Sequence, residues 1–146
     1  MRLGRLTALL AVTMTIAATS ALAADKPYTE GTVWTMTTIK VKPGQFEAYM
    51  RDVLPMRKKI DDEAKKEGLL LSSHVLSGQA SNAEDFDLVI LEEYKNFAAF
   101  DGISAKYDAV LAKVGSSEEQ QTQTMEKRVE LRTIIGEKTL QEIVPK

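Results

Sequence analysis

The stretch Phe86–Tyr94, with the sequence FDLVILEEY, constrains the fold more than any other part of this chain. Its centre, residues 88–91, is a short run of aliphatic side chains with acidic residues on both sides. Such a run indicates a β-strand covered on both faces, because a half-exposed strand would alternate between apolar and polar residues. A small domain containing this strand must therefore provide a layer of structure on each side of it.

The remaining segments predict three further strands and several helices. Residues rich in β-branched side chains predict strands, and apolar residues at three- and four-residue spacing predict helices. In chain order we expect a strand over 32–41, a helix over 45–66, a strand over 69–77, the strand 86–94, a broken helical region over 97–114, a polar helix over 116–132 and a strand over 138–144.

Details of the helices follow from individual residues. Pro55 lies inside the helical pattern of 45–66 and should kink that helix. The charged residues of this helix, Arg57 and Asp61 among them, are expected on its solvent-exposed face. Ser116 and Glu119 have the spacing of a capping box and should open the polar helix.

The order strand, helix, strand, strand, helical region, strand is that of the split βαβ motif. It predicts an α+β domain of ferredoxin-like type, with a four-stranded antiparallel sheet and helices on one face. The first three strands carry apolar residues on both sides, and the helices of one chain cover only one side. An exposed apolar sheet face is unfavourable in water, so we expect a second copy to pack sheet on sheet in a homodimer.

Three sequence segments, TVWTMTTIKV, KPGQFEAYM and LVILEEYKNFAAFDG, resemble the dimeric α/β-barrel superfamily. This superfamily includes antibiotic-biosynthesis-type monooxygenases and haem-degrading enzymes, and the resemblance extends over residues 32–144. It implies a ferredoxin-like subunit that pairs into a dimeric α/β barrel, with a ligand cavity between each sheet and its helices. The haem-degrading members use a histidine on a helix as iron ligand. The single histidine of this chain, His74, lies on a predicted strand, which argues against haem degradation.

The amino terminus has the pattern of a secretory signal peptide. Arg2 and Arg5 precede the apolar run Leu6–Ala18, and Ala21-Leu22-Ala23 matches a small-x-small cleavage site. The run is shorter than the roughly 20 residues that span a bilayer, although an uncleaved membrane anchor is the alternative. We therefore expect a periplasmic or secreted protein with no membrane attachment after cleavage. The predicted organisation is a signal peptide over 1–23, a mobile lead over 24–31 and one domain over 32–146.

Composition excludes several classes of function. The 146-residue chain carries 19 Lys and Arg against 21 Asp and Glu, so it has no general attraction for nucleic acid. It contains no cysteine and one histidine, which excludes disulfides, thiolate zinc sites, a cysteine nucleophile and a histidine-rich metal site within one subunit. The sequence contains no phosphate-binding glycine loop and no Ser–His–Asp pattern. We predict no metal and no cofactor.

Four residues are candidates for binding a small molecule. His74 is the only histidine, a residue type suited to acting as a general base or to orienting a ligand, and Trp34 is the only tryptophan and suits the wall of a pocket. Tyr49 and Tyr94 can hydrogen-bond a phenolic or quinone-like ligand. The alternative is that all four are ordinary packing or strand residues, and Tyr49 lies on the apolar stripe of its helix.

Two adjacent carboxylates, Glu92 and Glu93, end the central strand. They point to opposite faces and so do not form an acid–base pair. We expect both to lie beyond the buried part of the strand; a carboxylate facing inward would be a candidate for a raised pKa.

The sequence favours an exported homodimeric domain that binds a small apolar or aromatic molecule, or serves as a stress-related accessory protein, without evident catalytic machinery. A cofactor-independent monooxygenase acting on a small aromatic or quinol substrate is the first alternative, with Trp34, His74 and a tyrosine as orienting groups. A purely structural or interaction module is the second.

Overall fold

The computed structural model describes residues 26–115 and 117–146, so the predicted signal peptide lies outside the described residues. The elements in chain order are β1 (Tyr28–Val41), α1 (Phe46–Asp52), α2 (Leu54–Lys66), β2 (Ser72–Ser77), β3 (Leu88–Tyr94), the 3-10 helix η1 (Phe97–Phe100), α3 (Ile103–Lys113), α4 (Glu118–Leu131) and β4 (Arg132–Pro145). None of the helices within these ranges is long and apolar enough to cross a membrane.

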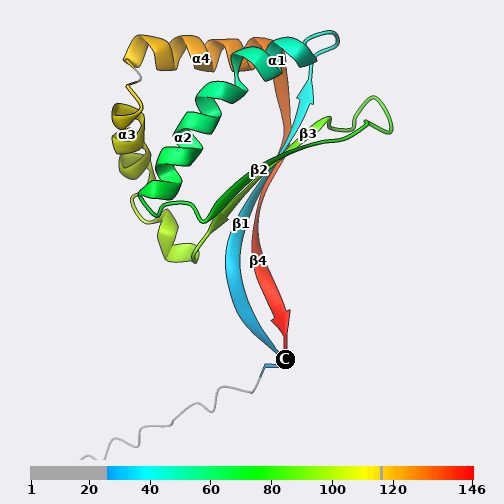
Figure 1. Ribbon diagram of the computed structural model, residues 1–146. Helices are drawn as coiled ribbons and strands as arrows, with labels where there is room; N and C mark the ends of the chain where they lie inside the picture. The colour runs from blue at the N-terminus through cyan, green and yellow to red at the C-terminus, as the bar shows by residue number, and fades with distance from the viewer. Residues whose placement is uncertain (1–25, 116) are drawn as a thin grey trace, which may run out of the picture.

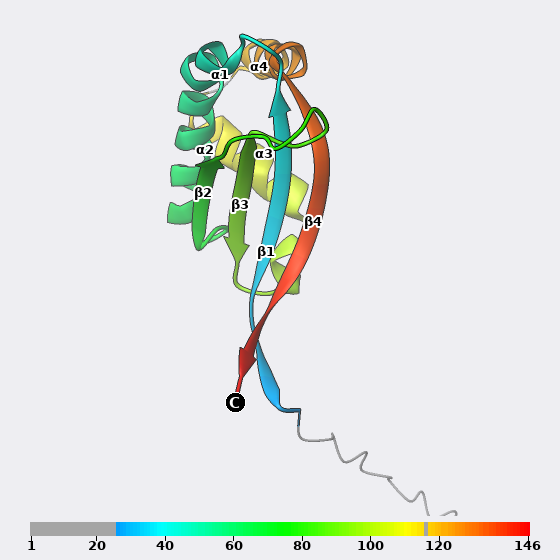
Figure 2. The same cartoon turned by 90° about the vertical axis from the view of Figure 1, so that its right-hand side faces the viewer.

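The four strands form one antiparallel sheet in the order β2-β3-β1-β4. All helices lie on one side of this sheet (Figure 1), and the view turned by 90° shows β1 and β4 extending together beyond β2 and β3 (Figure 2). The chain is therefore an α+β domain whose strand order is consistent with the predicted ferredoxin-like fold. β1 begins at Tyr28, earlier than expected, because residues 28–30 pair with β4.

The hydrophobic core lies between the sheet and the helices. One cluster contains Ile39, Val41, Tyr49, Val53, Leu88, Ile90 and Leu131, and a second contains Val33, Ala64, Leu70, Tyr94 and Val110. β3 contributes to both clusters and lies between β2 and β1, which confirms the FDLVILEEY stretch as a central strand.

The opposite side of the sheet, which we call the open face, carries the alternate residues of each strand. Its apolar members include Trp34, Met36, Leu76, Val89, Leu91 and Leu140, and its polar members include Thr38, Ser72, His74, Glu93 and Lys138. Directly paired residues share a face, and the register pairs Met36 with Leu91 and His74 with Leu91. Leu76 is 51% and Leu140 42% exposed, and none of the described helices lies over this face (Figure 1).

The strands predicted from residues 69 and 86 begin at Ser72 and Leu88, and further local predictions also differ from the structure. The helix predicted over 45–66 is divided into α1 and α2 at Val53, because Pro55 takes a position in the first turn of α2, where a missing N–H costs nothing. The capping box at the start of α4 is formed by Ser117 and Gln120, so the predicted pairing of Ser116 with Glu119 was displaced by one residue.

The last strand begins directly after α4 rather than at Lys138. The β-branched run of residues 133–135 favours extended backbone, and it pairs with the end of β1. The register shifts between Thr38, which pairs with Gly136, and Ile39, which pairs with Ile134. Ile135 is therefore the extra residue of a β-bulge, and the bulge connects two differently aligned halves of β4.

Candidate functional site

A buried ionic cluster connects α2 to the centre of the sheet. The Arg57 guanidinium donates a hydrogen bond of 2.6 Å to Glu92 Oε1 on β3. Its Nε atom lies 3.3 Å from Asp61 Oδ2, one helical turn further along α2. The three side chains are only 18%, 20% and 10% exposed, in the order Arg57, Glu92, Asp61. One cation therefore balances two carboxylates in a region that water reaches poorly.

Neutral side chains complete the hydrogen bonding of both carboxylates. Glu92 Oε2 accepts hydrogen bonds from Thr35 Oγ1 at 3.0 Å and from the Tyr94 hydroxyl at 3.2 Å. Asp61 Oδ2 accepts one from Ser73 Oγ at 2.7 Å. The hydroxyl of Tyr107 on α3 lies 3.5 Å from that of Tyr94. We call this set, Thr35, Arg57, Asp61, Ser73, Glu92, Tyr94 and Tyr107, the Arg57 network.

Burial controls the ionisation of the network. It raises the pKa of Asp61 above the usual value of an aspartate, although the charge of Arg57 and the hydrogen bond from Ser73 act in the opposite direction. Burial also raises the pKa of both Tyr94 and Tyr107, and the hydrogen bond to Tyr107 raises that of Tyr94 further. Both phenols are therefore neutral hydrogen-bond donors at physiological pH.

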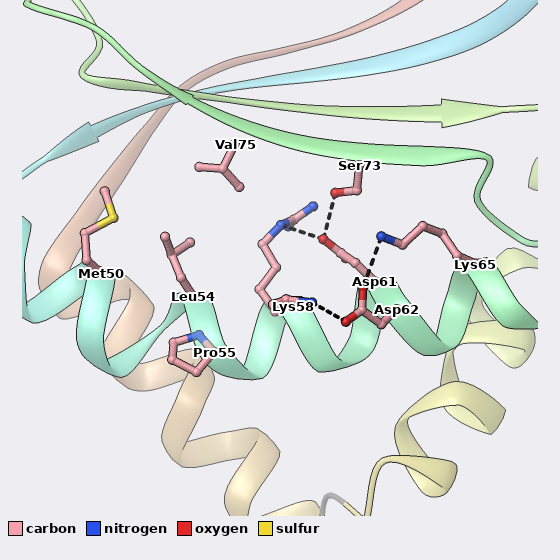
Figure 3. Close-up of a pocket in the computed structure, with 10 residues that line it drawn as sticks. Met50, Leu54, Pro55, Lys58, Asp61, Asp62, Lys65, Ser73 and Val75 are labelled. Atoms are coloured by element: carbon pink, nitrogen blue, oxygen red, sulfur yellow. Dashed lines mark hydrogen bonds and ion pairs between the residues drawn. The ribbon is translucent and has the colours of Figure 1, made fainter.

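A groove of about 530 Å³ between α2 and β2 borders the network, and we call it the α2–β2 groove. Asp61 and Ser73 point toward one another across it, from α2 and β2 respectively (Figure 3). The groove is lined by the apolar residues Met50, Leu54, Pro55 and Val75 and by the polar residues Arg57, Lys58, Asp61, Asp62, Lys65 and Ser73. Apolar contact surface combined with fixed polar groups is a common feature of small-molecule sites.

The chemistry available in the groove is hydrogen bonding and charge pairing. Asp61 accepts hydrogen bonds when ionised and donates one when protonated, while Arg57 and Ser73 hold it in place. Within residues 26–115 and 117–146, no group of three or more His, Asp or Glu side chains is arranged to hold a metal ion.

The four residues predicted to bind a ligand are divided between the two sides of the sheet. Trp34 and His74 lie on the open face, where Trp34 pairs with Glu93 and His74 with Leu91. Tyr49 and Tyr94 lie on the helix side. Tyr94 belongs to the Arg57 network.

Tyr49 is fully buried, and its hydroxyl accepts a 2.8 Å hydrogen bond from Arg132 instead. The four side chains therefore do not meet around one space within a subunit.

Two predictions about charged residues were wrong. Arg57 and Asp61 were expected on the solvent face of their helix, yet the Arg57 side chain is mostly covered and Asp61 is buried. They flank the apolar stripe on the side that packs toward β2 and β3, so the sheet covers them. Glu92 was expected beyond the buried part of its strand, but it faces the helices between Ile90 and Tyr94. Strand alternation was the available signal, because Ile90, Glu92 and Tyr94 share one side.

Comparison with known proteins adds little to this picture. No protein-family model and no curated protein matches the chain. Among solved structures, the crystal structure of protein SO0527 from Shewanella oneidensis has a TM-score of 0.48 and 14% sequence identity, and the match covers 80% of this chain and 96% of that chain. The description of the fold therefore rests on the strand order and pairing themselves.

Proposed function

We propose that this protein binds a small, mostly apolar molecule in the α2–β2 groove. The observation that carries the proposal is that Arg57, Asp61 and Ser73 belong both to the buried network and to the wall of a groove that also exposes apolar side chains. Burying an ion pair rarely adds stability over apolar residues of similar volume. Charges held in this position are better explained by recognition of a ligand that brings one polar group to an apolar site.

The geometry favours a ligand with one hydrogen-bonding group. Its apolar body would pack against Met50, Leu54 and Val75, and its polar group would face Asp61. A phenol or quinol suits this arrangement, because a hydroxyl donates to ionised Asp61 and accepts from the protonated form.

We further propose that the domain is exported and works as a homodimer through the open face. Sheet-on-sheet packing would cover the partly exposed side chains of Trp34, Leu76 and Leu91. The α2–β2 groove lies on the other side of the sheet and remains accessible in such a dimer. This arrangement accounts for the partly exposed apolar side chains of the open face without placing the ligand there.

The monooxygenase alternative combined Trp34, His74 and a tyrosine around one substrate. The first two lie on the opposite side of the sheet from the groove, so the groove does not bring them together with Tyr94. Binding without chemistry is therefore the function that we propose.

Two neighbouring residues of β2 provide a matched test. Val75 lines the groove, whereas Leu76, the next residue, faces the open side, and their exposed fractions are 37% and 51%. We expect p-cresol, a small phenol, to shift the backbone amide signal of Ser73 in a two-dimensional NMR titration. Val75→Gln should abolish this shift, and Leu76→Gln should leave it unchanged.

Two results would contradict the proposal. The first is the absence of p-cresol-dependent shifts at residues of the groove in the unchanged protein. The second is an equal effect of the two substitutions in β2. Mass spectrometry of material extracted from the purified protein then identifies the natural ligand.

A further inference from the structure

Two arginines at the junction of α4 and β4 have no carboxylate partner among residues 26–115 and 117–146. The Arg132 guanidinium donates its hydrogen bond to the Tyr49 hydroxyl, and its central carbon lies 5.8 Å from the centre of the Tyr49 ring. Arg128 is half-buried, and its Nε atom makes no hydrogen bond. Among the described residues, no carboxylate lies within ion-pair distance of either guanidinium, whereas neighbouring Lys127 pairs with Asp52 at 3.0 Å.

The two charges oppose each other. Burial lowers the pKa of Arg128, and the positive charge of Arg132 lowers it further. Two neighbouring cations in a partly desolvated place repel each other, and a bound anion would relieve that repulsion. The carboxyl end of α4 favours cations through its dipole, which helps to explain why Arg128 is tolerated there. That dipole does not provide a hydrogen-bond acceptor for the free Nε.

Both arginines line a hollow of about 980 Å³ along α4 and the start of β4, which we call the α4–β4 groove. Its apolar members Met125, Val129 and Ile134 are 64%, 72% and 47% exposed. The other lining residues are Lys42, Thr122, Glu126, Glu130 and Thr133. Three cations against two carboxylates leave a positive balance in the groove, beside an apolar strip.

We propose that the α4–β4 groove is a second binding site and takes an amphiphilic carboxylate, a free fatty acid or a similar molecule. The carboxylate lies against Arg128 and Arg132, and the alkyl chain covers the apolar strip. A guanidinium matches the two oxygens of a carboxylate in a bidentate pair, which a lysine does not. An exposed apolar strip beside such a pair fits a tail better than it fits a small inorganic anion.

Calorimetric titration of the protein with decanoate tests the site. Arg128→Gln should weaken decanoate binding by about tenfold or more, as expected for the loss of a charge-assisted hydrogen bond. Lys127→Gln is the matched control, because it removes the same charge from the preceding position of α4, outside the groove. Its effect should stay below about twofold. Acetate and 1-decanol, which lack the tail and the charge respectively, should each bind far more weakly.

A second variant distinguishes loss of the binding site from loss of the fold. Val129→Ser changes a side chain that is 72% exposed, so the fold should persist while decanoate binding falls. Unchanged decanoate affinity in Arg128→Gln would overturn the inference. So would binding of acetate or inorganic phosphate as tight as that of decanoate, since the apolar strip would then contribute nothing.

The inference is independent of the α2–β2 groove, and one variant separates the two. Val75→Gln should abolish the effect of p-cresol and leave decanoate binding intact. Loss of decanoate binding in Val75→Gln would place that ligand in the α2–β2 groove and overturn this second site. Loss of p-cresol binding alone leaves the second site supported.

Discussion

Replacing Arg57 by methionine tests whether one cation holds the candidate site together. Methionine is similar in length but forms no ion pair. The substitution leaves Asp61 and Glu92 facing each other across the helix–sheet layer without the charge that both contact. Since these carboxylates are only 10% and 20% exposed, water compensates little of the loss.

The expected magnitude follows from the burial of the cluster. Removing one member of a buried ion pair typically costs about 3–5 kcal/mol of unfolding free energy. Lys65 also acts on Asp61, and the hydroxyls of Thr35, Tyr94 and Ser73 stay in place, so we expect the lower end, about 3 kcal/mol. For a domain of this size, that corresponds to a decrease in melting temperature of roughly 10 °C.

Urea unfolding followed by far-ultraviolet circular dichroism measures this loss. Lys59→Met is the control, because Lys59 is exposed on the same helix, and its effect should stay within about 0.5 kcal/mol. Adding Asp61→Asn and Glu92→Gln to Arg57→Met should recover much of the stability, since the uncompensated charges are then gone. Acidification should also narrow the difference between Arg57→Met and the unchanged protein, because Asp61, whose pKa is raised by burial, loses the charge that Arg57 balances. A loss below about 1 kcal/mol, or an equal loss in Lys59→Met, would refute this account of the network.

Three further predictions concern ionisation and assembly. Burial raises the pKa of Asp61, so ionisation of Asp61 lowers the free energy of unfolding as pH rises above 3.8. Acidification should therefore stabilise the unchanged protein relative to Asp61→Asn. Urea unfolding of both proteins in the acid range measures this difference, and its absence would contradict the prediction. The raised pKa values of Tyr94 and Tyr107 stabilise the fold below about pH 10, and this contribution is lost at higher pH. Ultraviolet difference spectra should show that both phenols ionise only as the protein unfolds. Tyr94→Phe should reduce the loss of stability at alkaline pH. Leu91→Lys on the open face should convert a dimer into a monomer in sedimentation velocity, and a monomeric unchanged protein would exclude the proposed dimer.

The layout of the strands and helices could largely be predicted from local patterns. The central strand, predicted over Phe86–Tyr94 and observed over Leu88–Tyr94, was recognisable because its aliphatic run is short and bounded by acidic residues. Errors arose where two local signals competed. After α4, the chain continues into a strand at Arg132 because pairing with β1 stabilises an extended backbone that the polar helical pattern did not indicate.

The candidate site was harder to predict, because charge is a poor guide to burial. Arg57 and Asp61 look like members of a solvated helix face, and only their joint contact with Glu92 and Ser73 explains why they are buried. Conversely, Trp34 and His74 are the residues that attract attention in the sequence. The pairing register places both on the open face, away from the groove.

The sequence alone determined the type and order of the elements and the need to cover both faces of a central strand, since periodicity and turn residues act over short distances. The tertiary structure decided which charged residues meet. A guanidinium and a carboxylate separated by 35 positions in the chain come within 2.6 Å only when α2 packs onto β3. Whether such charges are paired or exposed depends on how the layers pack, because water is removed from these side chains only when the helices cover the sheet.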